Sequence, residues 1–162
     1  MPKFLVGRDI DFFRNVAREM VEKVIEETCV LYKINLKDTK VNIYGESMNK
    51  TWHKGVELYC LISKEAETPN YEGFGPDTNQ NIEFRFDREH CRDRNAYPEV
   101  GDVIYFNGSY YEIDNTNEIQ FVGGLPGGED NSPIGYDRRN WSIICTTFMV
   151  TKSNLNIEER IK

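Results

Sequence analysis

The 162-residue sequence lacks the patterns that most enzyme sites leave in a chain. It has only two histidines, His53 and His90, and no C-x-x-C pair, so a zinc site using them with Cys60 and Cys91 lacks the usual ligand spacing. No GK[ST] occurs, which leaves a phosphate-binding loop unsupported. A nucleophile built from Cys91 and a distant histidine has no supporting motif either, and both histidines are expected on the surface. We therefore predict no catalytic residue, no metal, no cofactor and no enzymatic activity.

Long apolar runs are also absent. No segment approaches the roughly 20 apolar residues that span a bilayer, and the N-terminus carries Lys3 and Arg8 without the apolar stretch of a signal peptide. We therefore expect no membrane association. The four cysteines, which are almost evenly scattered, are expected to stay reduced in a cytoplasmic environment rather than to form a disulfide framework.

Basic residues are outnumbered by acidic ones. Lys and Arg number 20 against 27 Asp and Glu, giving a net charge of −7. Because affinity for nucleic acid comes largely from Lys and Arg that neutralise phosphates, we expect no tight binding of DNA, although such a chain could surround DNA without gripping it. Apolar residues make up 39% of the chain and aromatic residues 12%, which favours a modest core with extensive interfaces.

The order of apolar patterns predicts one helix followed by about seven strands. Residues 9–32 are expected to form one long helix with Asp9 as its N-cap, because apolar residues recur at i, i+3 and i+4 spacing. We expect this apolar stripe to pack on a sheet, with contact to a neighbouring subunit as the alternative. Strands are predicted over residues 41–44, 55–63, 82–86, 103–106, 110–114, 119–122 and 141–151, with a turn or one helical turn over 88–95.

Two features refine this prediction. The near-continuous apolar run of residues 55–63 indicates a central strand, and Asn107-Gly108 predicts a type I′ hairpin turn within a β-meander of residues 103–122. The chain is therefore expected to be a single domain (1–162) of the α+β class, mainly β. The predicted architecture is a small antiparallel β-barrel or sandwich with one long N-terminal helix.

Two Gly- and Pro-rich segments, 64–81 and 123–137, are predicted to be long loops, and 151–162 a polar tail. The second loop contains Glu129 and Asp130, which lack the spacing of an EF-hand and are expected in a solvated loop rather than at a calcium site.

Arginines gather in local islands of this acidic chain. Two interpretations stay open: surface salt bridges, which contribute little each, or charge complementarity across subunit contacts. The residues concerned are Arg85, Arg88, Arg92, Arg94, Arg138 and Arg139.

The middle of the chain resembles a known family. The segments are Lys-Gly-Val-Glu-Leu-Tyr-Cys (54–60), Pro-Glu-Val-Gly-Asp-Val-Ile-Tyr-Phe (98–106) and Tyr-Glu-Ile (111–113). Together they resemble the neck (head–tail connector, or head-closure) proteins of tailed bacteriophages, nearest to those of contractile-tailed phages. The resemblance covers about residues 54–124 and leaves out the N-terminal helix and the acidic Gly-Pro loop.

The resemblance implies a structural virion protein located in the neck and assembled in the host cytoplasm. It implies a homo-oligomeric ring, a hexamer or else a dodecamer, that closes the DNA-filled head and docks the tail while DNA passes through its lumen without sequence-specific binding. Partners would be the portal or adaptor protein on the head side, and the tail terminator or the tail tube and sheath proteins on the tail side. Candidate interface and lumen residues are Tyr105, Tyr110, Tyr111, Glu129, Asp130, Arg138 and Arg139.

Other functions stay open at this stage. A tail terminator or another virion ring protein is the nearest alternative. An oligonucleotide- or sugar-binding β-barrel would need exposed aromatics such as Tyr105, Tyr110 and Tyr111 in a basic groove. A small hydrolase would need a reactive carboxylate or Cys91.

Overall fold

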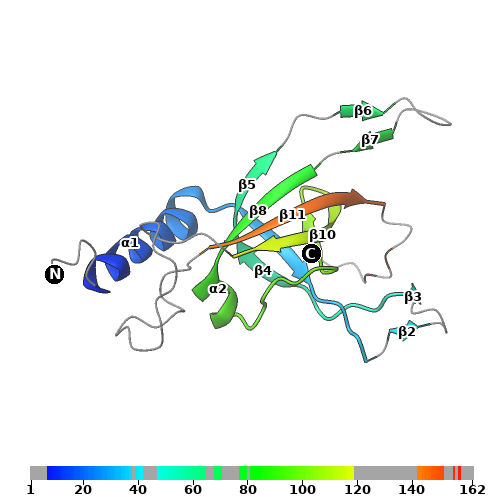
Figure 1. Cartoon of the computed structure of the whole chain (residues 1–162), viewed down its shortest axis with the longest axis horizontal. Helices are drawn as coiled ribbons and strands as arrows, with labels where there is room; N and C mark the ends of the chain where they lie inside the picture. The colour runs from blue at the N-terminus through cyan, green and yellow to red at the C-terminus, as the bar shows by residue number, and fades with distance from the viewer. Residues whose placement is uncertain are drawn as a thin grey trace.

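The computed structural model describes residues 7–37, 39–41, 47–64, 68–70, 77–79, 81–118, 142–151, 155 and 157 (Figure 1). In chain order its elements are α1 (Gly7–Glu19), the π-helical segment η1 (Met20–Ile25), β1 (Thr28–Tyr32), β2 (Lys40–Val41), β3 (Ser47–Asn49), β4 (Val56–Tyr59), β5 (Leu61–Lys64), β6 (Thr68–Asn70), β7 (Asp77–Asn79), β8 (Asn81–Asp87), α2 (Arg88–Asp93), β9 (Val103–Phe106), β10 (Ser109–Asn117) and β11 (Ser142–Val150).

Seven strands form one antiparallel sheet in the order β4-β1-β9-β10-β11-β8-β5. Its two end strands, β4 and β5, are separated in sequence by Cys60 alone, so the sheet curls until both ends come from one segment (Figure 1). The sheet is not closed into a barrel, and the predicted class, mainly β and antiparallel with an N-terminal helix, is confirmed. The prediction of a central strand over 55–63 is wrong. This segment instead forms the two edge strands, β4 and β5. Its residues Leu58 and Cys60 are apolar because the curled sheet buries them in the core.

The core lies inside the curl and follows the period of two that β-strands impose. In β8 the alternating residues Ile82, Phe84 and Phe86 are buried, which confirms the half-buried strand predicted there. The same core contains all four cysteines as buried free thiols, three from the sheet segments and Cys91 from α2: Cys29, Cys60, Cys91 and Cys145. Small thiols behave as small apolar groups in such a core.

The hairpin between β9 and β10 forms as its sequence predicts. Asn107 and Gly108 have φ values of 47° and 85°, as both central residues of a type I′ turn require. Among the described strands, the neighbours of β10 are β9 and β11, so the third strand of the predicted meander stays a prediction. Residues 119–122 themselves lie outside the described residues.

The N-terminal helix is shorter than predicted. It begins at Gly7, so Asp9 lies inside the helix rather than at its N-cap, and η1 ends at Ile25. Glu26 takes a left-handed conformation with φ of 51°, after which residues 28–32 form β1. In β1 Cys29 and Leu31 are buried on one face of the strand. The predicted helix over 26–32 is wrong because Cys29 fits the helical period and the strand period equally well.

Part of the expected loop 64–81 is a two-stranded ribbon in which β6 pairs with β7, and a second ribbon joins β2 to β3. Both ribbons extend from the side of the sheet away from α1 (Figure 1). In the tail, Leu155 and Ile157 pack against a cluster of Tyr32, Val103 and Tyr110. The loop 123–137, with Glu129 and Asp130, lies outside the described residues, as do Arg138 and Arg139.

Two glycines in the segments that resemble neck proteins occupy positions that other residues would not tolerate. A Cβ on Gly55 would lie 2.6 Å from Val30 Cγ1, so only glycine allows this close approach to β1. Gly101 has φ of +90°, a conformation that residues with a side chain rarely adopt. Both positions therefore require glycine for structural reasons.

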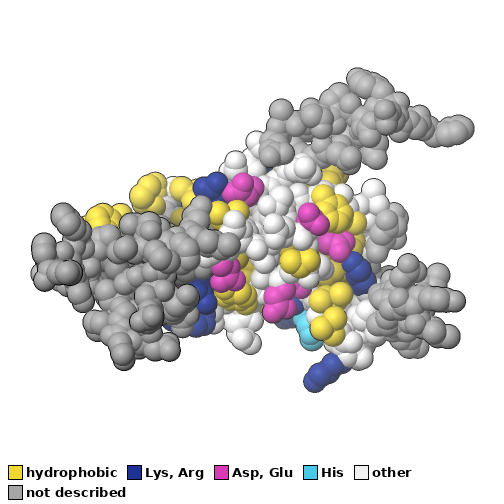
Figure 2. Space-filling view, viewed as in Figure 1, with side chains coloured by type: hydrophobic (Ala, Val, Ile, Leu, Met, Phe, Trp, Pro, Cys, Tyr) yellow, Lys and Arg dark blue, Asp and Glu magenta, His cyan; other side chains and the backbone are white. Residues whose placement is uncertain are grey.

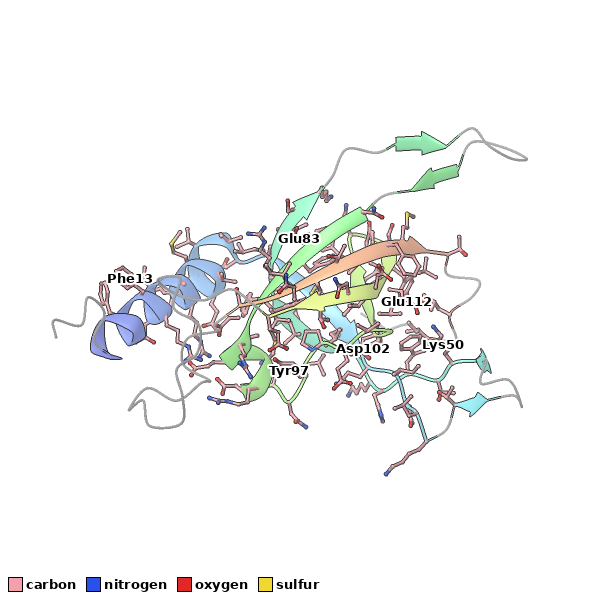
Figure 3. The ribbon with its side chains drawn as sticks, viewed as in Figure 1. Phe13, Lys50, Glu83, Tyr97, Asp102 and Glu112 are labelled. Atoms are coloured by element: carbon pink, nitrogen blue, oxygen red, sulfur yellow. The ribbon has the colours of Figure 1, made fainter. Side chains whose placement is uncertain are left out.

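Asp102 joins the end of β1 to the start of β9. Its fully buried carboxylate accepts the N–H groups of Ile34 at 3.0 Å and of Glu99 at 2.9 Å (Figure 3). Its backbone carbonyl accepts the N–H of Ile113 in β10 at 2.9 Å. Burial raises the pKa of Asp102, although these N–H donors and Lys33 act in the opposite direction.

We predict that Asp102→Ala lowers the free energy of unfolding by about 3 kcal/mol, because two backbone N–H groups lose their acceptor. Asp102→Asn keeps one side-chain oxygen and is expected to lose about half as much. Urea denaturation followed by circular dichroism measures both. The matched control is Asp114→Ala on the exposed side of β10, expected within about 0.5 kcal/mol of the wild type. An Asp102→Ala variant as stable as this control contradicts the assigned role.

Candidate interaction surface on the N-terminal helix

The apolar side of the N-terminal helix faces away from the molecule's own core. Among the side chains described in α1 and η1, only Arg14 is buried. Six large apolar side chains along this helix are exposed by 39–72%: Phe12, Phe13, Val16, Met20, Val24 and Ile25. Figure 3 shows Phe13 pointing away from the sheet, and Figure 2 shows hydrophobic side chains at the surface at the helix end of the molecule. The prediction that this stripe packs on the sheet is therefore wrong for the described part of the chain. We call these six residues the α1 apolar face.

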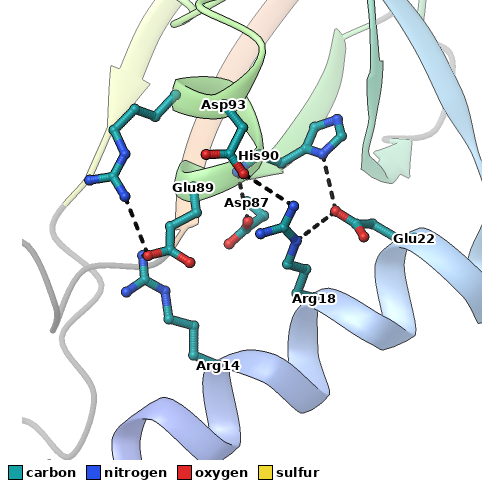
Figure 4. A network of polar contacts seen from close by, with 8 residues as sticks. Arg14, Arg18, Glu22, Asp87, Glu89, His90 and Asp93 are labelled. Carbon is teal, nitrogen blue, oxygen red and sulfur yellow. Dashed lines mark hydrogen bonds and ion pairs between the residues drawn. The ribbon is translucent and has the colours of Figure 1, made fainter.

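The polar side of the same helix faces α2 through a row of charged contacts (Figure 4). Arg14 Nη2 lies 2.7 Å from Glu89, and Arg18 Nη2 lies 3.3 Å from Asp93. Glu22 Oε1 is 2.8 Å from Arg18 Nε, and it also contacts α2. Residues 14, 18 and 22 are four apart, so they lie on one helix face, and this spacing was the sequence signal for the contact with α2.

His90 is the α2 partner of Glu22. Its Nδ1 lies 3.1 Å from Glu22 Oε1, and its ring centroid lies 5.4 Å from that of Tyr59. Asp87 caps α2 by accepting the N–H of His90 at 2.9 Å. His90 is only 5% exposed, so its expected surface location is wrong, whereas His53 is exposed as expected. The reason is that α1 covers this side of α2.

The acidic groups of this contact have altered pKa values. Burial raises the pKa of Glu22, but the hydrogen bonds and charges of Arg18 and His90 outweigh it and lower the pKa below its usual value. Burial raises the pKa of Asp87, although the N–H of His90 and the charges of Arg18 and Arg14 oppose it. The contact therefore depends on an ionised Glu22.

We also searched the described part of the chain for a metal site, a membrane-spanning helix and a reactive cysteine. Within it no group of three or more His, Cys, Asp or Glu could hold a metal ion, and none of its helices is long and apolar enough to cross a membrane. Burial, with smaller contributions from Asp87 and Cys145, raises the pKa of Cys91 far above its usual value. A thiol that stays protonated is a poor nucleophile.

Of the predicted tyrosines, the structure brings Tyr105 and Tyr110 together, whereas Tyr111 lies in the main core on the other face of β10. Tyr110 is 7% exposed, and its ring centroid lies 5.0 Å from that of Tyr105 across the hairpin. Tyr111 is 4% exposed and packs in the core 5.9 Å from Phe84, centroid to centroid. The burial of Tyr110 and Tyr111 disfavours a barrel that stacks bases or sugars on these two rings.

Several arginines of the predicted islands form ion pairs. Arg85 pairs with Glu83 at 2.7 Å and Arg92 with Glu89 at 3.5 Å, within or beside their own elements. These contacts fit the interpretation as surface salt bridges. The α1 apolar face was not among the predicted site residues and is the candidate surface that the structure adds.

We predict that Glu22→Gln weakens the contact between α1 and α2 at pH 7 and that the difference from the wild type disappears at low pH. Because the folded-state pKa of Glu22 is lowered, its contribution to stability is present above its unfolded pKa of about 4.5 and is lost as pH falls through the folded value. Amide hydrogen exchange of α1 and α2, followed from pH 7 downward through the acid range, measures the effect.

The matched control is Glu19→Gln. Glu19 lies on the same helix but pairs with Lys23 within it, so exchange in α2 should not change. If amide exchange in α2 at pH 7 is the same in Glu22→Gln as in Glu19→Gln, then Glu22 does not contribute to the contact between α1 and α2.

Comparisons with known proteins identify a fold relative. No protein-family model and no curated protein matches the chain. Among solved structures, the fold is similar to that of a chain in a structure entitled "Virion of native gene transfer agent (GTA) particle". The TM-score is 0.50 at 10% sequence identity, and the alignment covers 76% of this chain and 94% of that chain. At this identity the likeness concerns the fold alone.

Proposed function

We propose that this chain is a structural subunit of a virion neck, which assembles into a ring between the portal and the tail. The observation that carries the proposal is the fold likeness to nearly the whole of a chain from a gene transfer agent virion. The three segments that resemble phage neck proteins support the same role, and they form β4, the entry to β9, and the β9–β10 hairpin.

The positions of the exposed apolar side chains support assembly through head-to-tail contacts, in which two different patches of identical copies meet. The α1 apolar face projects beyond one end of the sheet, and the C-terminal end of β11 lies toward the opposite end (Figure 1). Near that end Phe148 and Met149 are 42% and 43% exposed. A contact that joins two different patches of identical copies is head-to-tail, and such contacts close into rings when the rotation between copies allows it. We assign the α1 apolar face to this contact.

The remaining features fit a neck ring. The β2–β3 and β6–β7 ribbons extend from the sheet and are suited to reach the adjacent layers, the portal or adaptor above and the tail proteins below. The net charge of −7 suits a wall along which duplex DNA slides without being held. In this role the ring closes the filled head and docks the tail, and a hexamer is the expected size.

We predict that Phe13→Glu combined with Val16→Glu abolishes ring formation and leaves the folded monomer as stable as the wild type. Both side chains are exposed in the isolated chain, so folding does not depend on them. Burying each in a contact contributes about 2 kcal/mol, so losing both weakens each contact by roughly a thousandfold. Native mass spectrometry and electron microscopy, with and without purified portal complex, measure assembly, and thermal denaturation measures folding.

The control variant is Asn15→Glu, which adds one negative charge at an exposed position on the same helix outside the α1 apolar face. It should assemble as the wild type does. A wild-type chain that stays monomeric and ignores portal and tail complexes would overturn the neck assignment. A ring that persists in the double variant would instead remove α1 from the subunit contact.

A further inference from the structure

The outer face of the sheet carries a second apolar cluster at the end of the molecule opposite α1. Tyr32 of β1, Val103 of β9 and Tyr110 of β10 form it, and all three are buried. The residues beside them in each strand belong to the main core, so the cluster lies on the other face of the same strands. Tyr110 pairs with Val150 at the C-terminal end of β11, which lies away from α1 (Figure 1). We call Tyr32, Val103 and Tyr110 the outer cluster.

The C-terminal tail supplies part of what covers the outer cluster. Among the described residues, five partly buried apolar side chains pack against it. Val30 and Tyr105 are neighbours of the cluster in β1 and β9, and Trp52 comes from the segment after β3. The other two, Leu155 and Ile157, belong to the tail, and their spacing of two is the one at which an extended segment turns alternate side chains to one side. The free chain therefore fills this site with side chains of its own tail.

The outer cluster continues into the patch on β11 that the proposed ring contact uses. Tyr110 pairs with Val150, and Glu112 pairs with Phe148. Residues that stand directly opposite each other on neighbouring strands share a face of the sheet. Phe148 is 42% exposed and therefore lies on the same face as Tyr110, two positions along β11 from Val150. The cluster and Phe148 form one apolar surface, part of which the tail covers.

The α1 apolar face has the composition to replace the tail on this surface. It presents six large apolar side chains, whereas the described tail contributes two. Because the favourable free energy of burial grows with apolar area, the helix can displace the tail. A chain cannot place its own α1 there, since ion pairs hold the helix on α2 at the other end of the molecule (Figures 1 and 4). The α1 that fits the site is that of a second copy.

We propose that the outer cluster and Phe148 receive the α1 apolar face of the neighbouring copy, and that the tail occupies this site in the free chain as a displaceable strap. The inference rests on the proposed ring contact and identifies the surface that accepts α1. It also gives the tail a regulatory role. Two apolar side chains have to leave the site before a neighbour can dock, so the tail opposes self-assembly of free chains.

The test uses two full-length chains that can form only one such contact. The acceptor carries Phe13→Glu and Val16→Glu, which block its α1, and Leu155→Asp and Ile157→Asp, which release its tail. The donor is the fluorescently labelled wild-type chain. We expect saturable one-to-one binding by fluorescence anisotropy. An acceptor with the same α1 substitutions and the wild-type tail should bind about tenfold or more weakly, because the donor has to displace two apolar side chains. A donor with both α1 substitutions should not bind.

The matched control acceptor carries Asn154→Asp and Asn156→Asp in place of the changes at Leu155 and Ile157. It adds the same two charges to the tail but keeps both apolar side chains. It should bind as weakly as the acceptor with the wild-type tail. Circular dichroism checks that each acceptor is folded, and a further acceptor with Leu155→Ser and Ile157→Ser releases the tail without adding charge.

The outcomes separate the parts of the proposal. Equal binding by acceptors with released and wild-type tails would overturn the role of the tail as a strap. Binding that survives in the α1-substituted donor would overturn α1 as the occupant. Absence of binding by every acceptor would overturn the acceptor site. The neck assignment is tested separately by ring formation of the wild type on the portal complex, so its failure is distinguishable from failure of this inference.

Discussion

The buried carboxylate of Asp102 holds together the strands from which the curled sheet is built. Its two oxygens bind the N–H groups of Ile34, just after β1, and of Glu99, while its carbonyl binds Ile113 in β10. Because β1 pairs with β4, and β10 pairs with β11, the sheet continues from the strands around Asp102 toward both of its edges. A buried charge is tolerated only where such donors compensate for lost water. The curl therefore depends on this acid and on the positive φ of Gly101 before it.

The N-terminal helix is attached to the rest of the molecule by ion pairs, which contribute less to stability than apolar burial does. Its contacts with α2 run through charged side chains, and partly exposed ion pairs contribute about 0–1 kcal/mol each. Its six large apolar side chains, by contrast, are left exposed, and burying such a side chain contributes about 1.5–3 kcal/mol. The helix therefore has more free energy to gain from a second molecule than from its own sheet. This imbalance is the physical reason to place the interface on α1.

The sequence predicted the elements whose signals are local. Asn107-Gly108 determined the hairpin, and the alternation of Ile82, Phe84 and Phe86 determined β8. Periodicity could not show which side of the N-terminal helix faces its own sheet, because an apolar stripe looks the same whether it meets a core or a partner. That choice is made by Arg14, Arg18 and Glu22, whose partners on α2 are 68 to 75 residues away in the chain. The outward orientation of the α1 apolar face depends on such distant pairing, so periodicity alone could not identify it.

The residues that carry the family resemblance mostly satisfy backbone geometry. Gly55 allows close approach to β1, Gly101 supplies a positive φ, and Asp102 binds two backbone N–H groups. A motif of this kind specifies a fold, and the structural likeness to a virion chain likewise concerns the fold. Function on a shared fold is determined by the surfaces added to it. Here the surface that we propose is the α1 apolar face, whose residues lie outside the resembling segment. The N-terminal helix, which the resemblance does not cover, therefore carries the surface on which the proposed assembly depends.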